Sequence, residues 1–397
     1  MVGSDLTKDG KRANPSCLGQ YLKGKRSGAA RSGSAAFCPL NSQLICSMRR
    51  RMTTDAQPID SLTPPLTASI PLAPELIGVG SPLVDLILPV GHDFLGSHVE
   101  GAKGGMQMVD AELIQRLLGI SDRQPTQSPG GAAANTTVGC AHLGIRAAFI
   151  GACGEDEYGD FYHQALVAQN CEPRLVRQAG QPTGRVLSMV TPDAERTMRT
   201  CLGAAATLDP AHFTAETFRG VRVVMLEGYT LFNHDLTRAI AKAAKAAGCQ
   251  LALDFASFEV VRANRPVIDE LLDGMVDLMF ANEDEAKAWN DTSPEAALED
   301  LASRVAVVAV KLGKDGAMIA RGKERVRVAA DVVEAIDTTG AGDCWAAGFL
   351  AGHLRGLPLD QCGRLGSLSG SAVVQVMGAQ LPRERWLAIK GYLDAWA

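Results

Sequence analysis

Short apolar runs alternate with helix-length segments along most of the chain that follows Leu76. "VRVVMLEGY", "CQLALDFAS" and "VAVVAV" have the length and composition of strands that are buried on both faces, as in parallel sheets. Segments with a helical pattern separate such runs, as in "HDLTRAIAKAAKAAG". This alternation predicts an α/β fold: a doubly wound, mostly parallel sheet with helices on both faces.

Two segments do not fit this alternation. Residues 91–110 are glycine-rich and mixed in pattern. "GRVLSMVTPDAERTMRTCLG" predicts a hairpin whose turn lies at 192–194. We therefore expect the segments near 91–110 and 185–202 to form a small β lid over the sheet.

The first 70 residues differ from the rest of the chain. Residues 1–52 hold ten basic side chains against two acidic ones, a net charge of +8 in a chain whose total is −5. Residues 1–70 show no sustained periodicity, so we expect a basic, disordered extension ahead of one domain over 73–397. Three interpretations stay open: a transit peptide, a segment that binds an anionic surface, or an upstream extension of the reading frame. The abrupt change of composition at Met52 favours the last one.

Composition argues against several classes of function. A net charge of −5 gives no sign of nucleic-acid binding. The chain has no apolar run of about 18 residues, so no membrane span is expected. Its ten cysteines form no Cys-x-x-Cys pair, and most lie among apolar residues. They predict buried, reduced thiols in a cytoplasmic protein, not a disulfide or zinc framework.

The segment "AIDTTGAGDCWAAGFLAG", residues 335–352, joins a glycine turn to a helix. Gly340, Ala341 and Gly342 lead into the helix start, where free N–H groups and the helix dipole favour an anion. Asp343 could accept a proton from a hydroxyl while these N–H groups hold a phosphoryl group, or it could only cap the helix. The chain has neither a GxxxxGK[ST] loop nor a GxGxxG after its first strand, so the usual nucleotide loops do not explain the segment.

Four sequence elements together resemble those of one enzyme family. "DTTGAGDCWAAGFLAG" resembles the C-terminal signature of the ribokinase-like, or PfkB-type, carbohydrate kinases, and "SPGGAAANTTVGCAHLG" with "AAFIGACGEDEYG" resembles their N-terminal signature. "FANEDEA" is similar to their Asn-x-x-Glu element, and "VKLGKDGA" to their nucleotide-side turn. The elements occur in family order within residues 76–382. "GVGSPLVDLIL", "ERTMRTCLGAAATL" and "LEGY" are most similar to adenosine-kinase-like members.

The resemblance implies a ribokinase-like fold and an ATP-dependent phosphotransferase. Its acceptor would be a primary hydroxyl of a sugar or nucleoside, with adenosine as the first candidate. At the matching positions, Asp343 is the general base that takes the acceptor's proton, and Gly340, Ala341 and Gly342 form the anion hole. Arg196 matches a lid arginine that neutralises phosphate charge, although it could also be a solvated hairpin residue. Phosphoryl transfer depends on positioning and charge neutralisation, which these groups supply.

The acceptor is expected beside Asp85 in "LIGVGSPLVDLIL", which we interpret as one buried strand interrupted by glycines. The resemblance implies that Asp85 binds sugar hydroxyls, and a buried carboxylate needs such partners. It also implies a pocket with a Gly-Gly-x-x-x-Asn wall and an aromatic that stacks on the base: Gly130, Gly131, Asn135 and Tyr229. The two glycines could instead serve only as a turn, and the aromatic only as packing.

On the nucleotide side, the resemblance implies an ATP loop formed by Lys311, Gly313 and Gly316. Asn282 and Glu285 match the pair that organises Mg²⁺ and its waters. Asn282 could also cap the helix that follows, and Glu285 could be a plain surface acid. Family members often bind K⁺, for which the backbone carbonyls of Asp337 and Thr339 are candidates.

Two departures from the adenosine-kinase pattern leave the acceptor open. Ser81 stands where those enzymes usually carry Asn, and Ala132 where a hydroxyl residue often follows the Gly-Gly pair. The alternative acceptor is a free sugar: ribose, fructose or a 2-keto-3-deoxy sugar acid. A non-catalytic sugar- or nucleotide-binding regulator on this fold would be expected to lose Asp343 or Arg196, and the missing dinucleotide loop argues against a dehydrogenase. Both a monomer and a homodimer are compatible with such a lid.

Overall fold

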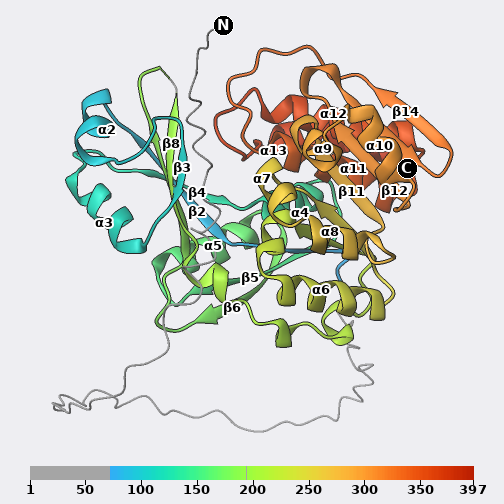
Figure 1. Cartoon of the computed structure of the whole chain (residues 1–397), viewed down its shortest axis with the longest axis horizontal. Helices are drawn as coiled ribbons and strands as arrows, with labels where there is room; N and C mark the ends of the chain where they lie inside the picture. The colour runs from blue at the N-terminus through green and yellow to red at the C-terminus, as the bar shows by residue number, and fades with distance from the viewer. Residues whose placement is uncertain (1–71, 194) are drawn as a thin grey trace, which may run out of the picture. The chain divides into compact units, whose positions relative to one another are not determined.

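The structure is a computed structural model that describes residues 72–397 with the exception of residue 194. These residues form two sheets and the helices around them (Figure 1). The expected N-terminal extension over 1–70 lies outside the described residues.

The larger sheet has nine strands. They are β1 (Leu76–Val79), β5 (Ala147–Gly154), β6 (Cys171–Gln178), β9 (Val223–Glu227), β10 (Gln250–Asp254), β11 (Leu278–Asn282), β12 (Val307–Lys311), β13 (Ala317–Arg321) and β14 (Glu324–Val328). Their order is β14-β13-β12-β11-β10-β9-β1-β5-β6. β12 pairs antiparallel with β13, and β13 antiparallel with β14, at one edge; every other neighbouring pair is parallel. The prediction of a mostly parallel sheet is confirmed.

Helices cover both faces of this sheet. One core joins it to α4 (Ala132–His142), α5 (Glu157–Ala168), α11 (Ala341–Leu354), α12 (Leu359–Val373) and α13 (Arg383–Trp396). The other core joins it to α6 (His234–Ala246), α7 (Phe258–Ala263), α8 (Arg265–Leu272), α9 (Glu283–Asn290) and α10 (Pro294–Ala302). The neighbours Leu76 and Ile77 are both fully buried, one in each core. Burial on both faces is why these strands are continuous apolar runs.

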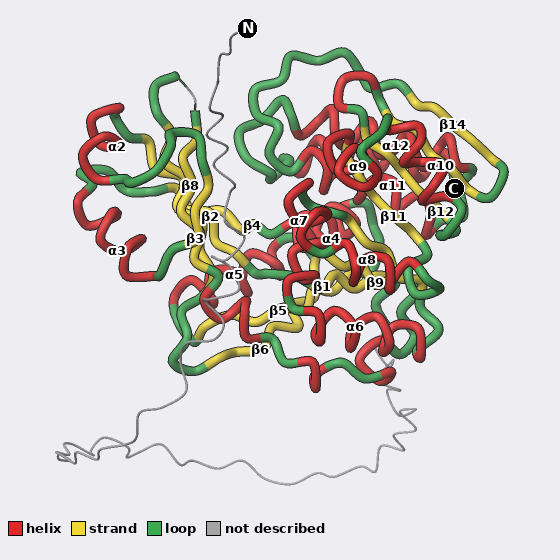
Figure 2. Tube along the Cα trace, in the orientation of Figure 1, coloured by secondary structure: helices red, strands yellow, loops and turns green. Residues whose placement is uncertain are grey.

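Five strands form the smaller sheet, in the order β3-β8-β7-β2-β4. They are β2 (Leu83–Pro89), β3 (Met106–Met108), β4 (Thr126–Gly130), β7 (Gly184–Val190) and β8 (Arg196–Cys201). The segments near 91–110 and 185–202 contribute β3, β7 and β8, and Figure 2 shows the helices α2 (His92–His98) and α3 (Ala111–Ile120) beside this sheet. Leu86 packs in one core with Leu117 of α3, whereas Asp85 on the opposite face stays partly exposed. One face of the smaller sheet is therefore covered and the other is open.

The interpretation of "LIGVGSPLVDLIL" as one strand is wrong. β1 is fully buried in the larger sheet, and β2 belongs to the smaller sheet, where buried and partly exposed residues alternate. The chain changes sheets at Gly80, Ser81 and Pro82. Proline lacks the N–H that a continuing ladder requires, so a break at this point is favoured.

Two further expectations concern the described residues as a whole. Their cysteines are all buried and free. No helix among these residues combines the length and the apolar character that crossing a membrane requires.

Candidate active site

A tight turn precedes helix α11. Gly340 adopts a left-handed conformation with φ 73°, and a Cβ at this position would lie 2.5 Å from the Cβ of Ala379. Glycine alone fits here without strain. Ala341, Gly342 and Asp343 then form the first turn of α11, whose N–H groups have no partner within the helix.

The side chain of Asp343 is held by helix α4. Asn135 donates from Nδ2 to Oδ2 of Asp343 across 2.9 Å, and the hydroxyl of Thr136 donates to the Asp343 carbonyl oxygen across 3.2 Å. Burial raises the pKa of Asp343 to about 7, against the Asn135 hydrogen bond, which lowers it. The helix cap is Gly340, without a side-chain cap, so Asp343 does not serve as the cap. The Asp343 carboxylate thus lies in the first turn of α11, where the N–H groups of Gly342 and Asp343 have no partner among the described residues, whereas that of Ala341 donates to the carbonyl oxygen of Thr338 across 3.2 Å.

The amide of Asn135 has a defined orientation. Gln380 donates from Nε2 to the carbonyl oxygen of Pro129 across 2.9 Å and to Oδ1 of Asn135 across 3.2 Å. With Oδ1 accepting this bond, the Nδ2 group of Asn135 is directed to Asp343. Sequence analysis does not identify Gln380, because it lies outside any motif, in the loop between α12 and α13.

Asp85 lies on the open face of the smaller sheet. It pairs with Ser128 of β4 and Val186 of β7. Burial raises the pKa of Asp85 to about 6, although the charge of Arg196 opposes the shift. A Cβ on Gly130 would lie 2.5 Å from Oδ2 of Asp85. Asp85 is thus close to the end of β4, directly ahead of α4.

Gly131 connects β4 to α4 in a conformation that favours glycine. Its φ is 103°, and a Cβ would lie 2.3 Å from the carbonyl oxygen of Ser81. The Gly130–Gly131 pair is therefore a turn, and it also brings the backbone close to Asp85. The two roles that the sequence left as alternatives are compatible.

Asn282 and Glu285 form a reciprocal capping box at the start of α9. The Glu285 N–H donates to Oδ1 of Asn282 across 2.9 Å, and the Asn282 N–H donates to Oε2 of Glu285 across 2.7 Å. Glu285 is not a surface acid, because only 2% of it is exposed. Burial, followed by the negative charge of Asp254, raises the pKa of Glu285 to about 7.

Lys311 lies beside the first turn of α11. A Cβ on Gly342 would lie 3.1 Å from its Nζ. Nζ also forms a buried ion pair with Oδ2 of Asp254 across 2.7 Å. The two residues end β12 and β10, on either side of β11. The turn after Lys311 contains Gly313 and Gly316, both at positive φ.

The charged side chains around Lys311, which are those of Asp254, Glu285 and Asp343, carry an excess of negative charge. Burial lowers the pKa of Lys311, but Asp254, Glu285 and Asp343 together raise it above its usual value. Three carboxylates against one ammonium, with oxygen as the donor atom, suit an added Mg²⁺. Within the described part of the chain, no cluster of three or more His, Cys, Asp and Glu side chains could hold a metal by itself. A metal here therefore needs further ligands, such as water and phosphate oxygens.

Arg196 of β8 reaches from the smaller sheet to the loop that precedes α11. It forms an ion pair with Oδ2 of Asp337 across 2.6 Å and donates to the hydroxyl of Thr339 across 3.1 Å. The Asp337 carboxylate also accepts the N–H groups of Thr339 and Gly378. Arg196 is therefore held at the loop that precedes α11 and is not a solvated hairpin residue.

Tyr229 follows β9 in the short helix η4 (Gly228–Phe232) and is 45% exposed. It is thus not a core residue. Among the described residues, no hydrogen bond links its hydroxyl to Asp85, Asn135 or Asp343. Its partly exposed side chain follows the carboxyl end of β9, the strand that ends at Glu227.

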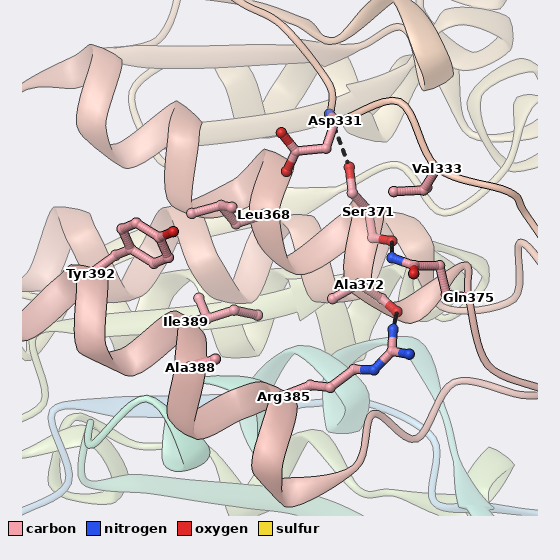
Figure 3. A pocket seen from close by; sticks show the side chains of 10 residues that line it. All are labelled: Asp331, Val333, Leu368, Ser371, Ala372, Gln375, Arg385, Ala388, Ile389 and Tyr392. Carbon is pink, nitrogen blue, oxygen red and sulfur yellow. Dashed lines mark hydrogen bonds between the residues drawn. The ribbon is translucent and has the colours of Figure 1, made fainter.

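A cavity of about 230 Å³ lies between α12, α13 and the loop around Asp331 (Figure 3). Leu368, Ile389 and Tyr392 give it a mainly apolar wall, and Arg385 donates to a backbone carbonyl oxygen at its edge. None of the residues predicted for the site lines it. The site is therefore defined by the side chains at the carboxyl ends of the strands and not by this cavity.

Comparison with known proteins identifies relatives over most of the chain. The family model described as pfkB family carbohydrate kinase matches residues 108–386. The solved structure of adenosine kinase from Sinorhizobium meliloti is 34% identical with a TM-score of 0.72, and the match covers 80% of this chain and 99% of that one. Adenosine kinase of Schizophyllum commune is 26% identical over 77% of this chain and 96% of its own length. Ribokinase of Arabidopsis thaliana is 28% identical over 66% of this chain and 70% of its own length.

The fold is ribokinase-like, as the resemblance implied. Because the family model covers well over half of the chain, the chain belongs to the pfkB family of carbohydrate kinases.

Proposed function

We propose that this phosphotransferase uses ATP to phosphorylate a primary hydroxyl of a nucleoside or sugar, with adenosine as the first candidate acceptor. The observation that carries the proposal is the placement of Asp343, held by Asn135 beside the free N–H groups of α11. A carboxylate next to an anion site is what hydroxyl phosphorylation requires.

In this mechanism Asp343 takes the proton of the acceptor hydroxyl as its oxygen forms a bond to the γ-phosphorus of ATP, and ADP leaves with the electrons of the broken P–O bond. A pKa of about 7 leaves a substantial fraction of Asp343 ionised and ready to accept at neutral pH. The N–H group of Gly342 stabilises the charge of the transferred group, and that of Ala341, which donates to the carbonyl oxygen of Thr338 across 3.2 Å, would add to it by exchanging this partner. Lys311 beside Gly342, and Arg196 once released from Asp337, add positive charge.

The acceptor would lie between Asp85, Asn135 and Asp343. The pKa of Asp85 is raised, and no basic side chain among the described residues forms an ion pair with it. Sugar hydroxyls would therefore satisfy the hydrogen-bonding capacity of its oxygens. Two observations favour a nucleoside. Tyr229 is exposed and available for stacking on a base, and the relatives at 34% and 26% identity are adenosine kinases.

Members of this family use ATP, generally with Mg²⁺. Asn282 and Glu285 would hold Mg²⁺ through water, and the loop of Lys311, Gly313 and Gly316 would border the nucleotide. When bound, the metal supplies charge neutralisation at the phosphates. For K⁺, the carbonyl oxygens of Asp337 and Thr339 accept no hydrogen bond from other described residues, so both are free to act as ligands.

The acceptor assignment is tested by measuring ADP formation with Mg·ATP and a panel of acceptors. Adenosine, other nucleosides, ribose, fructose and 2-keto-3-deoxygluconate form the panel. We expect the highest kcat/KM with adenosine and no turnover with 5′-deoxyadenosine, which lacks the hydroxyl. A kcat/KM for a free sugar at least tenfold above that for adenosine would show that the acceptor is the sugar. The absence of turnover with every compound would contradict the proposal.

A further inference from the structure

Glu227, the last residue of β9, is a buried carboxylate outside the mechanism described above. Only 1% of it is exposed. Its Oε1 accepts the backbone N–H of Ser81 across 2.8 Å, and its Oε2 accepts the backbone N–H of Ala133 across 3.0 Å. Both oxygens are therefore used, each by a different segment of the chain.

The two segments are crossings between the sheets. Ser81 lies where the chain leaves β1 of the larger sheet for β2 of the smaller sheet. Ala133 lies in the first turn of α4, directly after β4, where the chain leaves the smaller sheet. A single side chain on the larger sheet thus fixes both crossings that flank the Asp85 side of the site.

The surroundings of Glu227 are shaped for this contact. A Cβ on Gly80 would lie 2.4 Å from Oε2, so only glycine leaves room for the carboxylate. Burial raises the pKa of Glu227, whereas the N–H groups of Ala133 and Ser81 lower it. Among the described residues Glu227 forms no ion pair. A buried acid without a basic partner is costly for stability, so its presence calls for a role that an apolar residue could not fill.

We infer that Glu227 is a positioning residue that holds the crossing from β1 to β2, at Ser81, and the start of α4, at Ala133, in a fixed position relative to each other. Asn135 lies two residues beyond Ala133 and holds Asp343. Asp85 lies four residues beyond Ser81. Through these two links Glu227 aligns the acceptor-binding acid with the base. This inference rests on the proposed function for its kinetic consequence, but the link itself exists independently of any acceptor.

The test compares Glu227→Gln with the wild-type chain. Glutamine has one acceptor oxygen and an NH₂ group that only donates, so one of the two backbone N–H groups loses its partner. We expect kcat/KM for the acceptor to fall at least tenfold, while the dissociation constant of Mg·ATP, measured by calorimetry without acceptor, changes less than twofold. Glu227→Asp keeps both acceptor oxygens but withdraws them by one methylene, so an intermediate loss is expected.

Asp277→Asn is the matched control. Oδ2 of Asp277 accepts the Leu251 N–H across 2.8 Å and pairs with Lys245 at the opposite end of the strands. This variant should lower Tm without changing kcat/KM. If Asp277→Asn lowers kcat/KM as much as Glu227→Gln at a temperature well below both Tm values, general destabilisation explains the loss and the inference is overturned.

Hydrogen–deuterium exchange supplies a readout that needs no acceptor. In Glu227→Gln at least one of the amides of Ser81 and Ala133 should exchange at least tenfold faster, and in Asp277→Asn neither should change. Unchanged exchange at these amides would show that the link does not exist. Faster exchange with kcat/KM within twofold of wild type would show that the link is structural only. Should the wild type phosphorylate no acceptor, the proposed function fails while the exchange experiment still decides the link.

Discussion

Asn135 and Asp343 are joined by a hydrogen bond of 2.9 Å between Nδ2 and Oδ2, although they lie 208 positions apart in the sequence. This bond stabilises the ionised carboxylate and lowers its pKa, against burial, which raises it to about 7. A base acts only when deprotonated, so activity should rise with pH through this range.

Replacing Asn135 by Ala should move the pH range over which kcat/KM rises to higher pH. Removal of the donor takes away a contribution that lowers the pKa, so the pKa of Asp343 rises. The measurement is the pH profile of kcat/KM, with an expected shift of about one unit, the size of a charge-assisted hydrogen bond. Thr136→Val serves as control, because Thr136 bonds the carbonyl oxygen of Asp343 and not its carboxylate. A shift of equal size in both variants would contradict the assignment.

Lys311→Met should weaken ATP binding. The ammonium lies beside Gly342, where the phosphates are expected, and its loss removes positive charge from a site rich in carboxylates. We expect KM for ATP to rise at least tenfold with little change in KM for the acceptor. Lys245→Met removes a lysine whose ion pair is also 2.7 Å long but lies at the far end of the sheet. An ATP KM that responds equally to both changes would exclude a local role for Lys311.

Arg196→Met should reduce kcat with a smaller effect on KM. The guanidinium is poised at Asp337 and Thr339, next to the turn that leads into α11. Loss of an arginine that stabilises transferred phosphoryl charge costs on the order of 10³ in rate. Arg174→Met, which removes only a surface pair with Glu172, should leave kcat unchanged. A kcat within threefold of wild type in Arg196→Met would place this arginine outside the chemistry.

Gly131→Ala should destabilise the protein and impair the acceptor site. Its φ of 103° is unfavourable for alanine, and the new Cβ would lie 2.3 Å from the Ser81 carbonyl oxygen. Gly180 also has a positive φ, 73°, but open space around it. Thermal unfolding should show a small decrease in Tm for Gly180→Ala, from a cost of about 1 kcal/mol, and a clearly larger one for Gly131→Ala. Equal decreases would mean that the close approach to Ser81 is unimportant.

The sequence predicted the larger sheet well because its strands are covered on both faces. Such strands are apolar throughout, as β9 and β12 show, and they can be recognised without knowing their neighbours. β6 lacks this signal: it is an edge strand of mixed composition, "CEPRLVRQ", that is mostly half-exposed. The division between β1 and β2 was missed because apolar residues continue past Pro82, and only the alternation around Asp85 indicates an open face.

Within the site, sequence motifs located single residues but not the contacts between them. The position of Asp343 follows from the local pattern at a helix start, and that of the Asn282–Glu285 pair from the resemblance of "FANEDEA" to a family element. The partners of Lys311 and Asn135 do not, since Asp254 and Gln380 meet them only after strands and loops distant in sequence come together. Glu227 was overlooked for the same reason: its function depends on two backbone N–H groups, which no motif records.

The most direct test of the account is the turnover of Asp343→Asn. Asparagine preserves the shape of the side chain but cannot take a proton from the acceptor. We expect kcat to fall by about 10³-fold or more, while calorimetry shows Mg·ATP and acceptor bound within threefold of wild-type affinity. A variant that retains kcat within tenfold of wild type would contradict the assignment of Asp343 as the base.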